Sequence, residues 1–133
     1  MENRYKLFLI DDQHVINFVH KKIIKLVVPE VEIMDFVDPI FALETIKNTR
    51  PNLIFLDLNM PHMNGWQLLD HMTEQQIMVP VIIITSSGSH ADRTKAEDYP
   101  QVMGYEQKPL HRTGFENLFH RLASNKIYST PQL

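Results

Sequence analysis

The chain has 133 residues, 44% of them hydrophobic and 22% charged, a balance typical of one globular domain with its own core. Its formal net charge of −3 gives no basic field, so we expect neither direct nucleic-acid binding nor membrane attachment. The lack of cysteine excludes disulfides and thiolate metal sites. No apolar run is long enough to span a bilayer and the N-terminus does not resemble a signal peptide, so we expect a cytoplasmic protein.

Five short apolar runs are predicted to be β-strands. In chain order they are Lys6–Ile10, Val31–Phe36, Asn52–Leu56, Val81–Thr85 and Val102–Gln107. The segments between them have helical spacing, with apolar residues at Ile16, Val19, Ile23 and Leu26, then Ala42, Leu43 and Ile46, then Gly65, Leu68, Leu69 and Met72, and finally Phe115, Leu118, Phe119 and Leu122. The weakest helical segment is Ser89–Tyr99, which has only Ala91 and Ala96 as apolar anchors.

The alternation of strands and helices predicts an α/β fold. At this size, the expected solution is a flavodoxin-like, doubly wound, five-stranded parallel sheet of order 2-1-3-4-5 with helices on both faces. We expect a single domain over residues 1–133, with a core at about residues 5–124 and a C-terminal tail at 125–133. We expect no linker to a further domain.

Polar side chains stand where four of the predicted strands end. Asp11 and Asp12 follow the first strand, Asp57 follows the third, Thr85 ends the fourth and Lys108 follows the fifth. Because the carboxyl ends of parallel strands share one edge of the sheet, we expect these groups to lie in one crevice.

Three clustered carboxylates repel one another, and without a cation one of them should have a raised pKa. Hard oxygen ligands without Cys or His favour Mg²⁺ (or Mn²⁺) over Zn²⁺. A carboxylate is also a nucleophile that forms an acyl phosphate. The developing charge would be stabilised by Lys108, the Thr85 hydroxyl and backbone N–H groups.

Four stretches of sequence, taken together and in this order, resemble a known family. They are Asp11-Asp12, the loop from Asp57 to Gly65, Thr85-Ser86-Ser87, and Tyr105-Glu106-Gln107-Lys108-Pro109. They resemble the receiver domain of two-component response regulators, in particular a stand-alone receiver like the chemotaxis regulators. The resemblance covers about residues 5 to 124.

The resemblance implies a role for each acidic position. Asp57 would be the phosphoacceptor, Asp12 would bind Mg²⁺ directly, and Asp11 would bind it through water. The backbone carbonyl of Asn59 would be a further Mg²⁺ ligand. Asp57 alone could be an ordinary loop residue, and Asp11 could instead cap the following helix.

The remaining roles concern the phosphoryl group and the switch. Thr85 and Lys108 would contact the phosphoryl group, and the orientation of Tyr105 would respond to Thr85. The bond between Lys108 and Pro109 would be cis. Without the resemblance, Thr85 is also a normal strand residue, Lys108 a solvated charge and Tyr105 a packing residue.

Three features depart from the commonest receiver pattern. Ser86 stands where a small apolar residue is frequent, Glu106 stands where an aliphatic residue is frequent, and Tyr105 follows Gly104 directly in a short strand. None of these removes a reactive group.

The implied function is a phosphoacceptor switch rather than an enzyme that turns over a substrate. A sensor histidine kinase or histidine phosphotransfer protein would supply the phosphoryl group. The surface of the fourth helix, fifth strand and fifth helix would then control a protein target whose identity is unknown.

Three other functions compete with this one. An aspartyl-phosphate phosphatase or transferase usually has a second acid two residues after the nucleophile, where this chain has Asn59. An FMN carrier needs a Ser/Thr/Gly-rich loop after the first strand, where Asp11-Asp12-Gln13 would repel phosphate. A degenerate receiver is disfavoured by the intact acids.

The seven histidines form no i, i+4 pair and are interpreted as scattered surface residues, although His62 could tune the site.

Overall fold

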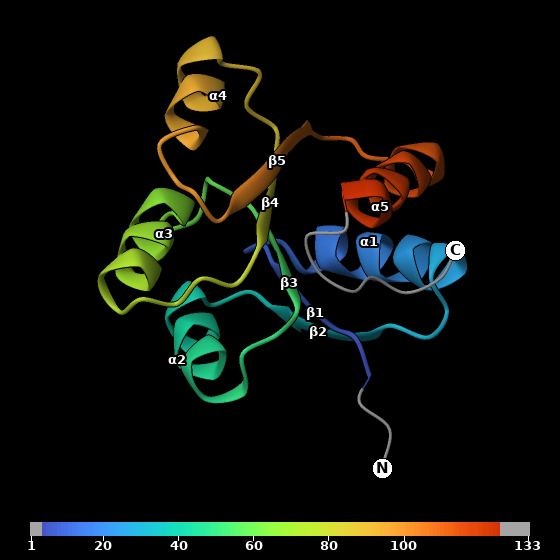
Figure 1. Cartoon of the computed structure of the whole chain (residues 1–133), viewed down its shortest axis with the longest axis horizontal. Helices are drawn as coiled ribbons and strands as arrows, with labels where there is room; N and C mark the ends of the chain where they lie inside the picture. The colour runs from blue at the N-terminus through green and yellow to red at the C-terminus, as the bar shows by residue number, and fades with distance from the viewer. Residues whose placement is uncertain (1–3, 126–133) are drawn as a thin grey trace.

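The structure is a computed structural model that describes residues 4–125. These residues form five strands and five helices in strict alternation (Figure 1). The strands are β1 (Lys6–Ile10), β2 (Glu32–Phe36), β3 (Leu53–Leu56), β4 (Val81–Thr85) and β5 (Val102–Gln107). The helices are α1 (His14–Val27), α2 (Pro39–Thr49), α3 (Gly65–Glu74), α4 (His90–Ala96) and α5 (Arg112–Asn125).

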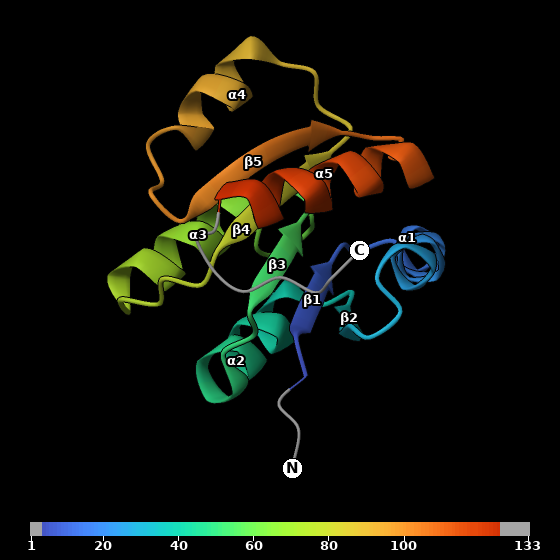
Figure 2. The same ribbon diagram turned by 45° about the vertical axis from the view of Figure 1, so that its right-hand side comes forward.

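The sheet has the order β2-β1-β3-β4-β5, and every pair of neighbouring strands is parallel. The α/β fold and the strand order predicted from the sequence are therefore confirmed. Ile10, the last residue of β1, pairs with Phe36 on one side and Leu56 on the other. β1, β2 and β3 consequently end level with one another, and Figure 2 shows the arrowheads of β1 and β3 pointing the same way.

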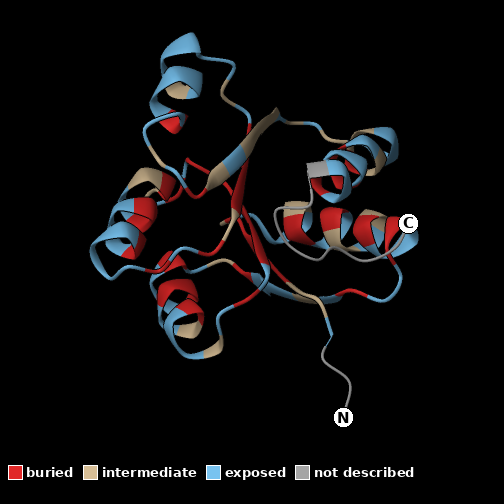
Figure 3. Ribbon diagram, in the orientation of Figure 1, coloured by how far each residue is buried: buried red, intermediate tan, exposed pale blue. Residues whose placement is uncertain are grey.

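The two faces of the sheet carry separate layers of helices. α1 and α5 cover one face, and α2, α3 and α4 cover the other (Figure 1). Alternate residues of a strand point to opposite faces, so Phe8 packs towards α2 and α3 while Leu9 packs towards α1 and α5. The strands β1, β3 and β4 are buried throughout most of their length, as Figure 3 shows.

Side-chain caps fix where three of the helices begin. Asp38 accepts from the Ile40 N–H ahead of α2, and Ser89 accepts from the Asp92 N–H ahead of α4. Asn64 and Gln67 form a reciprocal capping box at the start of α3. These caps satisfy N–H groups that the first helical turn leaves without partners.

The buried face of α1 differs from the periodicity seen in the sequence. Val19 and Leu26 are exposed, and the buried residues are Asn17, His20, Ile24 and Val27. The core-facing side of α1 therefore begins with two polar residues. The interpretation of the histidines as surface residues is wrong for His20, which is only 8% exposed.

Other expectations need smaller corrections. β2 and β3 begin one residue later than expected, at Glu32 and Leu53. Only Ala96 of the two alanines anchors α4, since Ala91 is exposed. Asn125 is the last residue of α5 rather than part of a tail, and residues 126–133 of the expected tail lie outside the described residues. Among residues 4–125, no helix combines the length and apolar character needed to cross a bilayer.

Candidate functional site at the carboxyl edge of the sheet

Three carboxylates meet at the carboxyl ends of β1 and β3. One oxygen each from Asp11, Asp12 and Asp57 lies within 4.8 Å of the other two. The backbone holds two of them in register with the sheet, because Asp11 donates its N–H to the Phe36 carbonyl at 3.0 Å and Asp57 donates to the Ile10 carbonyl at 2.9 Å. Asp11 and Asp57 are buried, and Asp12 is half-buried.

Lys108 brings a positive charge into this cluster from the end of β5. Its Nζ lies 2.5 Å from Asp11 Oδ2 and 3.6 Å from Asp57 Oδ1. Its backbone N–H donates to the Thr85 carbonyl at 2.8 Å, which extends the pairing of β5 with β4 by one residue. The bond between Lys108 and Pro109 is cis. The structure thus places Lys108 among the acids rather than on the solvated surface.

The protonation of Asp57 is shifted by its surroundings. Burial raises the pKa of Asp57 above its ordinary value of 3.8, and the charge of Asp11 raises it as well. Three groups act in the opposite direction and lower this pKa, namely the Lys108 ammonium, the Asn59 backbone N–H and the Thr85 hydroxyl. The charge of Asp57 therefore depends on the groups that lie beside it.

Thr85 and Tyr105 lie on the neighbouring strands β4 and β5. Thr85 is fully buried, and its Oγ1 accepts from the Ser87 N–H at 3.4 Å. The Tyr105 hydroxyl donates to the Ser87 carbonyl at 3.0 Å, and the Arg93 guanidinium lies 4.7 Å from the centre of the Tyr105 ring. Tyr105 is therefore connected through Ser87 to the loop that follows Thr85.

The residues that depart from the commonest receiver pattern have definite places. The Ser86 side chain is exposed and its carbonyl lies 3.5 Å from Gln107 Nε2. Glu106 forms an ion pair with Arg121 at 2.6 Å, which joins β5 to α5.

Gly65 leaves no room for a side chain, because a Cβ there would lie 2.6 Å from the Asp57 carbonyl oxygen. The start of α3 consequently packs directly against the backbone of Asp57.

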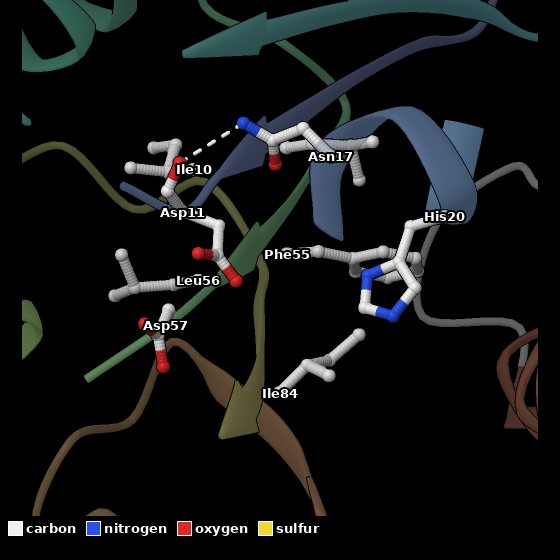
Figure 4. A pocket seen from close by; sticks show the side chains of 9 residues that line it. Ile10, Asp11, Asn17, His20, Phe55, Leu56, Asp57 and Ile84 are labelled. Carbon is white, nitrogen blue, oxygen red and sulfur yellow. Dashed lines mark hydrogen bonds between the residues drawn. The ribbon is translucent and has the colours of Figure 1, made fainter. Parts of the chain in front are cut away.

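Two residues of α1 that sequence reasoning did not select also border the site. Figure 4 shows Asn17 and His20 on the side of Asp11 that faces α1. They line a cavity of about 10 Å³ together with Asp11 and Asp57. Their signal in the sequence was a pair of polar residues spaced i, i+3 on the helix that follows the acidic pair.

The donor set of this site fits a divalent cation. Asp57 Oδ1 is buried and makes no hydrogen bond to any residue in the described part of the chain. A buried carboxylate oxygen without a donor carries a free-energy cost that a cation would remove. All the side-chain ligands are hard carboxylate oxygens, which suit Mg²⁺ or Mn²⁺.

A parallel five-stranded sheet with such a cluster at its carboxyl edge defines a class of doubly wound proteins with an acidic site. Within that class, this chain belongs to the response regulator receiver domain family, whose model matches residues 7–120. That match covers most of the chain, as the resemblance in the sequence implied.

Individual relatives agree with this assignment. A two-component response regulator of Arabidopsis thaliana is 32% identical over 92% of this chain and 20% of its own length. A protein-glutamate methylesterase/protein-glutamine glutaminase of Treponema pallidum is 35% identical over 65% of this chain and 21% of its own length. This chain therefore spans about a fifth of each of these two relatives.

A solved structure extends the comparison to the fold. The two-component response regulator from Cytophaga hutchinsonii superposes with a TM-score of 0.80 at 28% identity. The superposition covers 92% of this chain and 99% of that one.

Proposed function

We propose that this protein is the phosphoacceptor switch of a two-component phosphorelay, and that Asp57 accepts the phosphoryl group. The observation that carries the proposal is the meeting of Asp11, Asp12 and Asp57 within 4.8 Å, with Lys108 Nζ beside two of them. We further propose that residues 1–133 form a single cytoplasmic receiver domain that regulates other proteins and does not turn over a small substrate.

In the proposed reaction, a carboxylate oxygen of Asp57 attacks the phosphorus atom of the donor. A new P–O bond forms, the bond from phosphorus to the donor nitrogen breaks, and its electron pair leaves with the imidazole. Asp57 must be deprotonated to attack, and Lys108 favours that state because it lowers the pKa of Asp57. The Lys108 ammonium and the Thr85 hydroxyl would also stabilise charge on the transferred oxygens.

Asp11, Asp12, Asp57 and the backbone carbonyl of Asn59 would hold Mg²⁺, or Mn²⁺ in its place. Such an ion, when bound, relieves the repulsion between the carboxylates and offsets charge on the phosphoryl oxygens. The buried Asp57 Oδ1, which lacks a hydrogen bond to the described residues, supports this arrangement.

A histidine kinase or histidine phosphotransfer protein is the proposed donor. α1 begins two residues after Asp12, and Val15, Phe18 and Val19 on its outer side are exposed apolar residues. A macromolecular donor that brings a histidine to Asp57 would contact them. Exposed apolar side chains next to a reactive site are typical of protein interfaces.

The proposed output surface is that of α4, β5 and α5. Tyr105, Arg93 and Met103 line a groove of about 470 Å³ between α4 and β5. A shift of Thr85 towards a phosphoryl group would move the loop through Ser87, whose carbonyl accepts the Tyr105 hydroxyl. This link supports a change in the groove on phosphorylation, read by a protein target that is not identified.

Labelling with a small phosphodonor tests the proposal. Wild type, Asp57→Asn and the exposed control Asp98→Asn are incubated with acetyl phosphate and Mg²⁺, and the adduct is mapped by mass spectrometry. We expect one phosphoryl group on Asp57 in wild type and Asp98→Asn, and none in Asp57→Asn. Removal of Mg²⁺ with a chelator should abolish the labelling. Equal labelling of wild type and Asp57→Asn would refute the assignment.

A further inference from the structure

We propose that Asn17 is a positioning residue that holds the Asp11-Asp12 pair in the geometry needed to bind the metal ion. This inference rests on the function proposed above and adds a residue that neither the motifs nor the family comparison assigns. It begins from the burial and the two hydrogen bonds of the Asn17 amide.

Asn17 is a buried amide on the first turns of α1, with 1% of its surface exposed. Its Nδ2 donates to the Asp11 carbonyl at 2.9 Å and to the Phe36 carbonyl at 3.1 Å. Figure 4 shows the first of these bonds as a dashed line from Asn17 to Asp11. One side chain therefore joins the end of β1, the residue that ends β2, and α1.

These two carbonyls lie where the sheet stops. Ile10 is the last residue of β1, so the Asp11 carbonyl falls beyond the paired part of the strand. The Phe36 carbonyl accepts from the Asp11 N–H as well as from Asn17. A buried carbonyl without a donor is costly, so the Asn17 amide replaces the partner that a longer strand would have supplied.

The same bond fixes the direction of the acidic pair. Only Asp12 and Gln13 separate Asp11 from the start of α1. Both backbone groups of Gln13 are hydrogen-bonded. Its N–H donates to Asp11 Oδ1 at 2.9 Å, and its carbonyl accepts from the Asn17 N–H at 3.2 Å. The peptide that links Asp11 to Asp12 carries the carbonyl that Asn17 binds. Rotation of that peptide would turn the Asp12 carboxylate away from Asp57, and the Asn17 amide opposes this rotation.

A positioning role makes a different prediction from a purely structural one. Loss of any buried amide lowers stability, whereas only loss of Asn17 should also weaken metal binding. Gln101 provides the matched control, because it is 2% exposed and its Nε2 donates to Thr73 Oγ1 at 3.2 Å. It precedes β5, at the opposite edge of the sheet from the carboxylates.

The experiment compares Asn17→Leu with Gln101→Leu, each of which removes an amide and keeps a side chain of similar size. Mg²⁺ affinity is measured by calorimetry, and amide hydrogen exchange is measured at Asp11 and Gln13 without metal. We expect Asn17→Leu to weaken Mg²⁺ binding roughly tenfold, the usual effect of removing a group that orients a ligand. It should also speed exchange at Asp11 and Gln13, while Gln101→Leu changes neither quantity.

If Asn17→Leu does not fold, Asn17→Ser, which is shorter and keeps one donor, is measured in its place with the same expected direction. Equal Mg²⁺ affinity in the Asn17 and Gln101 variants would overturn the positioning role. Such a result would leave labelling of Asp57 in wild type intact. Wild-type protein that neither binds Mg²⁺ nor is labelled on Asp57 would instead refute the proposed function and, with it, the role of Asn17.

Discussion

His20 is a buried imidazole beside the acidic cluster, and burial is the main reason that its pKa is lowered to about 4. The Lys108 ammonium lowers this pKa further, and the Asp11 carboxylate acts in the opposite direction. The ring packs edge-on against Phe115 of α5, with 5.2 Å between the ring centres. His20 is therefore a neutral packing residue at physiological pH.

This environment predicts a loss of stability in mild acid. The folded pKa of His20 lies below the ordinary value of 6.5, so the stability that it contributes is fully present above pH 6.5. That stability is lost as pH falls from 6.5 towards about 4, by on the order of 3 kcal/mol. Urea unfolding of wild type and His20→Gln in metal-free buffer across this range measures the difference.

The exposed residue His120 supplies the control for this experiment. His120→Gln should retain the pH dependence of wild type, whereas His20→Gln should show a shallower one between pH 6.5 and 4.5. Parallel curves for wild type and His20→Gln would show that His20 does not titrate in this way.

Residue types at strand ends identified most of the site in advance. Asp11, Asp12, Asp57 and Lys108 stand out in the sequence because they follow strands whose carboxyl ends share one edge of the predicted sheet, although each alone could be a loop, capping or surface residue. Asn17 and His20 did not stand out. Hydrophobic periodicity treats a polar residue as solvent-facing, and the carbonyls that Asn17 satisfies become visible only when β1 and β2 are paired.

Helix α1 has apolar residues on two sides. Its inner side packs on the sheet and α5 through Ile24 and Val27, and its outer side exposes Val15, Phe18 and Leu26. The sequence shows both apolar sides but does not distinguish them, because their spacings are similar. Which side is buried depends on which polar residues of α1 find hydrogen-bond partners in the protein interior.

The outer side of α1 gives a prediction about the phosphodonor. Phe18 is 62% exposed, so Phe18→Glu should leave folding and labelling by acetyl phosphate unchanged. Transfer from a protein donor should slow roughly tenfold, since removal of a central interface aromatic typically costs more than 1 kcal/mol. The donor is the kinase that labels wild type fastest within a panel of histidine kinases from the same organism.

Ile40→Glu on α2 is the matched control for this measurement, because Ile40 is 55% exposed on a different helix. Ile40→Glu should accept the phosphoryl group at the wild-type rate from both acetyl phosphate and the kinase. Transfer from the kinase that is equally fast in Phe18→Glu and wild type would exclude this part of α1 from the donor interface.

The sheet was predictable largely because β1, β3 and β4 are almost continuous apolar runs. β1, β4 and β5 have the bounds expected from the sequence. β3 begins after Asn52, whose Oδ1 accepts from the Lys6 N–H while its own N–H donates to the Lys6 carbonyl. Asn52 therefore bonds to β1 from a position just outside the strand, which composition alone does not indicate.

The charge of Asp57 in the acidic cluster should lower the free energy of unfolding of the metal-free protein at neutral pH. The folded pKa of Asp57 is raised, so its contribution to stability is fully present below about pH 3.8 and is lost as pH rises through the folded pKa. Asp57→Asn should consequently have a higher melting temperature than wild type at pH 7 in chelator. Mg²⁺ should stabilise wild type and have a much smaller effect on the variant.

Calorimetry at pH 7, with and without Mg²⁺, tests this expectation. The exposed acid control Asp98→Asn should keep the wild-type response to Mg²⁺. A lower melting temperature for metal-free Asp57→Asn than for wild type would show that the carboxylate stabilises the fold.

The ion pair between Lys108 and Asp11 joins residues that are 97 positions apart in the chain. A ribosome therefore releases Asp11, Asp12 and Asp57 well before it has made the ammonium that neutralises them. During that interval the nascent chain holds the acidic half of its site without its basic half. The order of synthesis thus makes Lys108 the last of these charged residues to join the site.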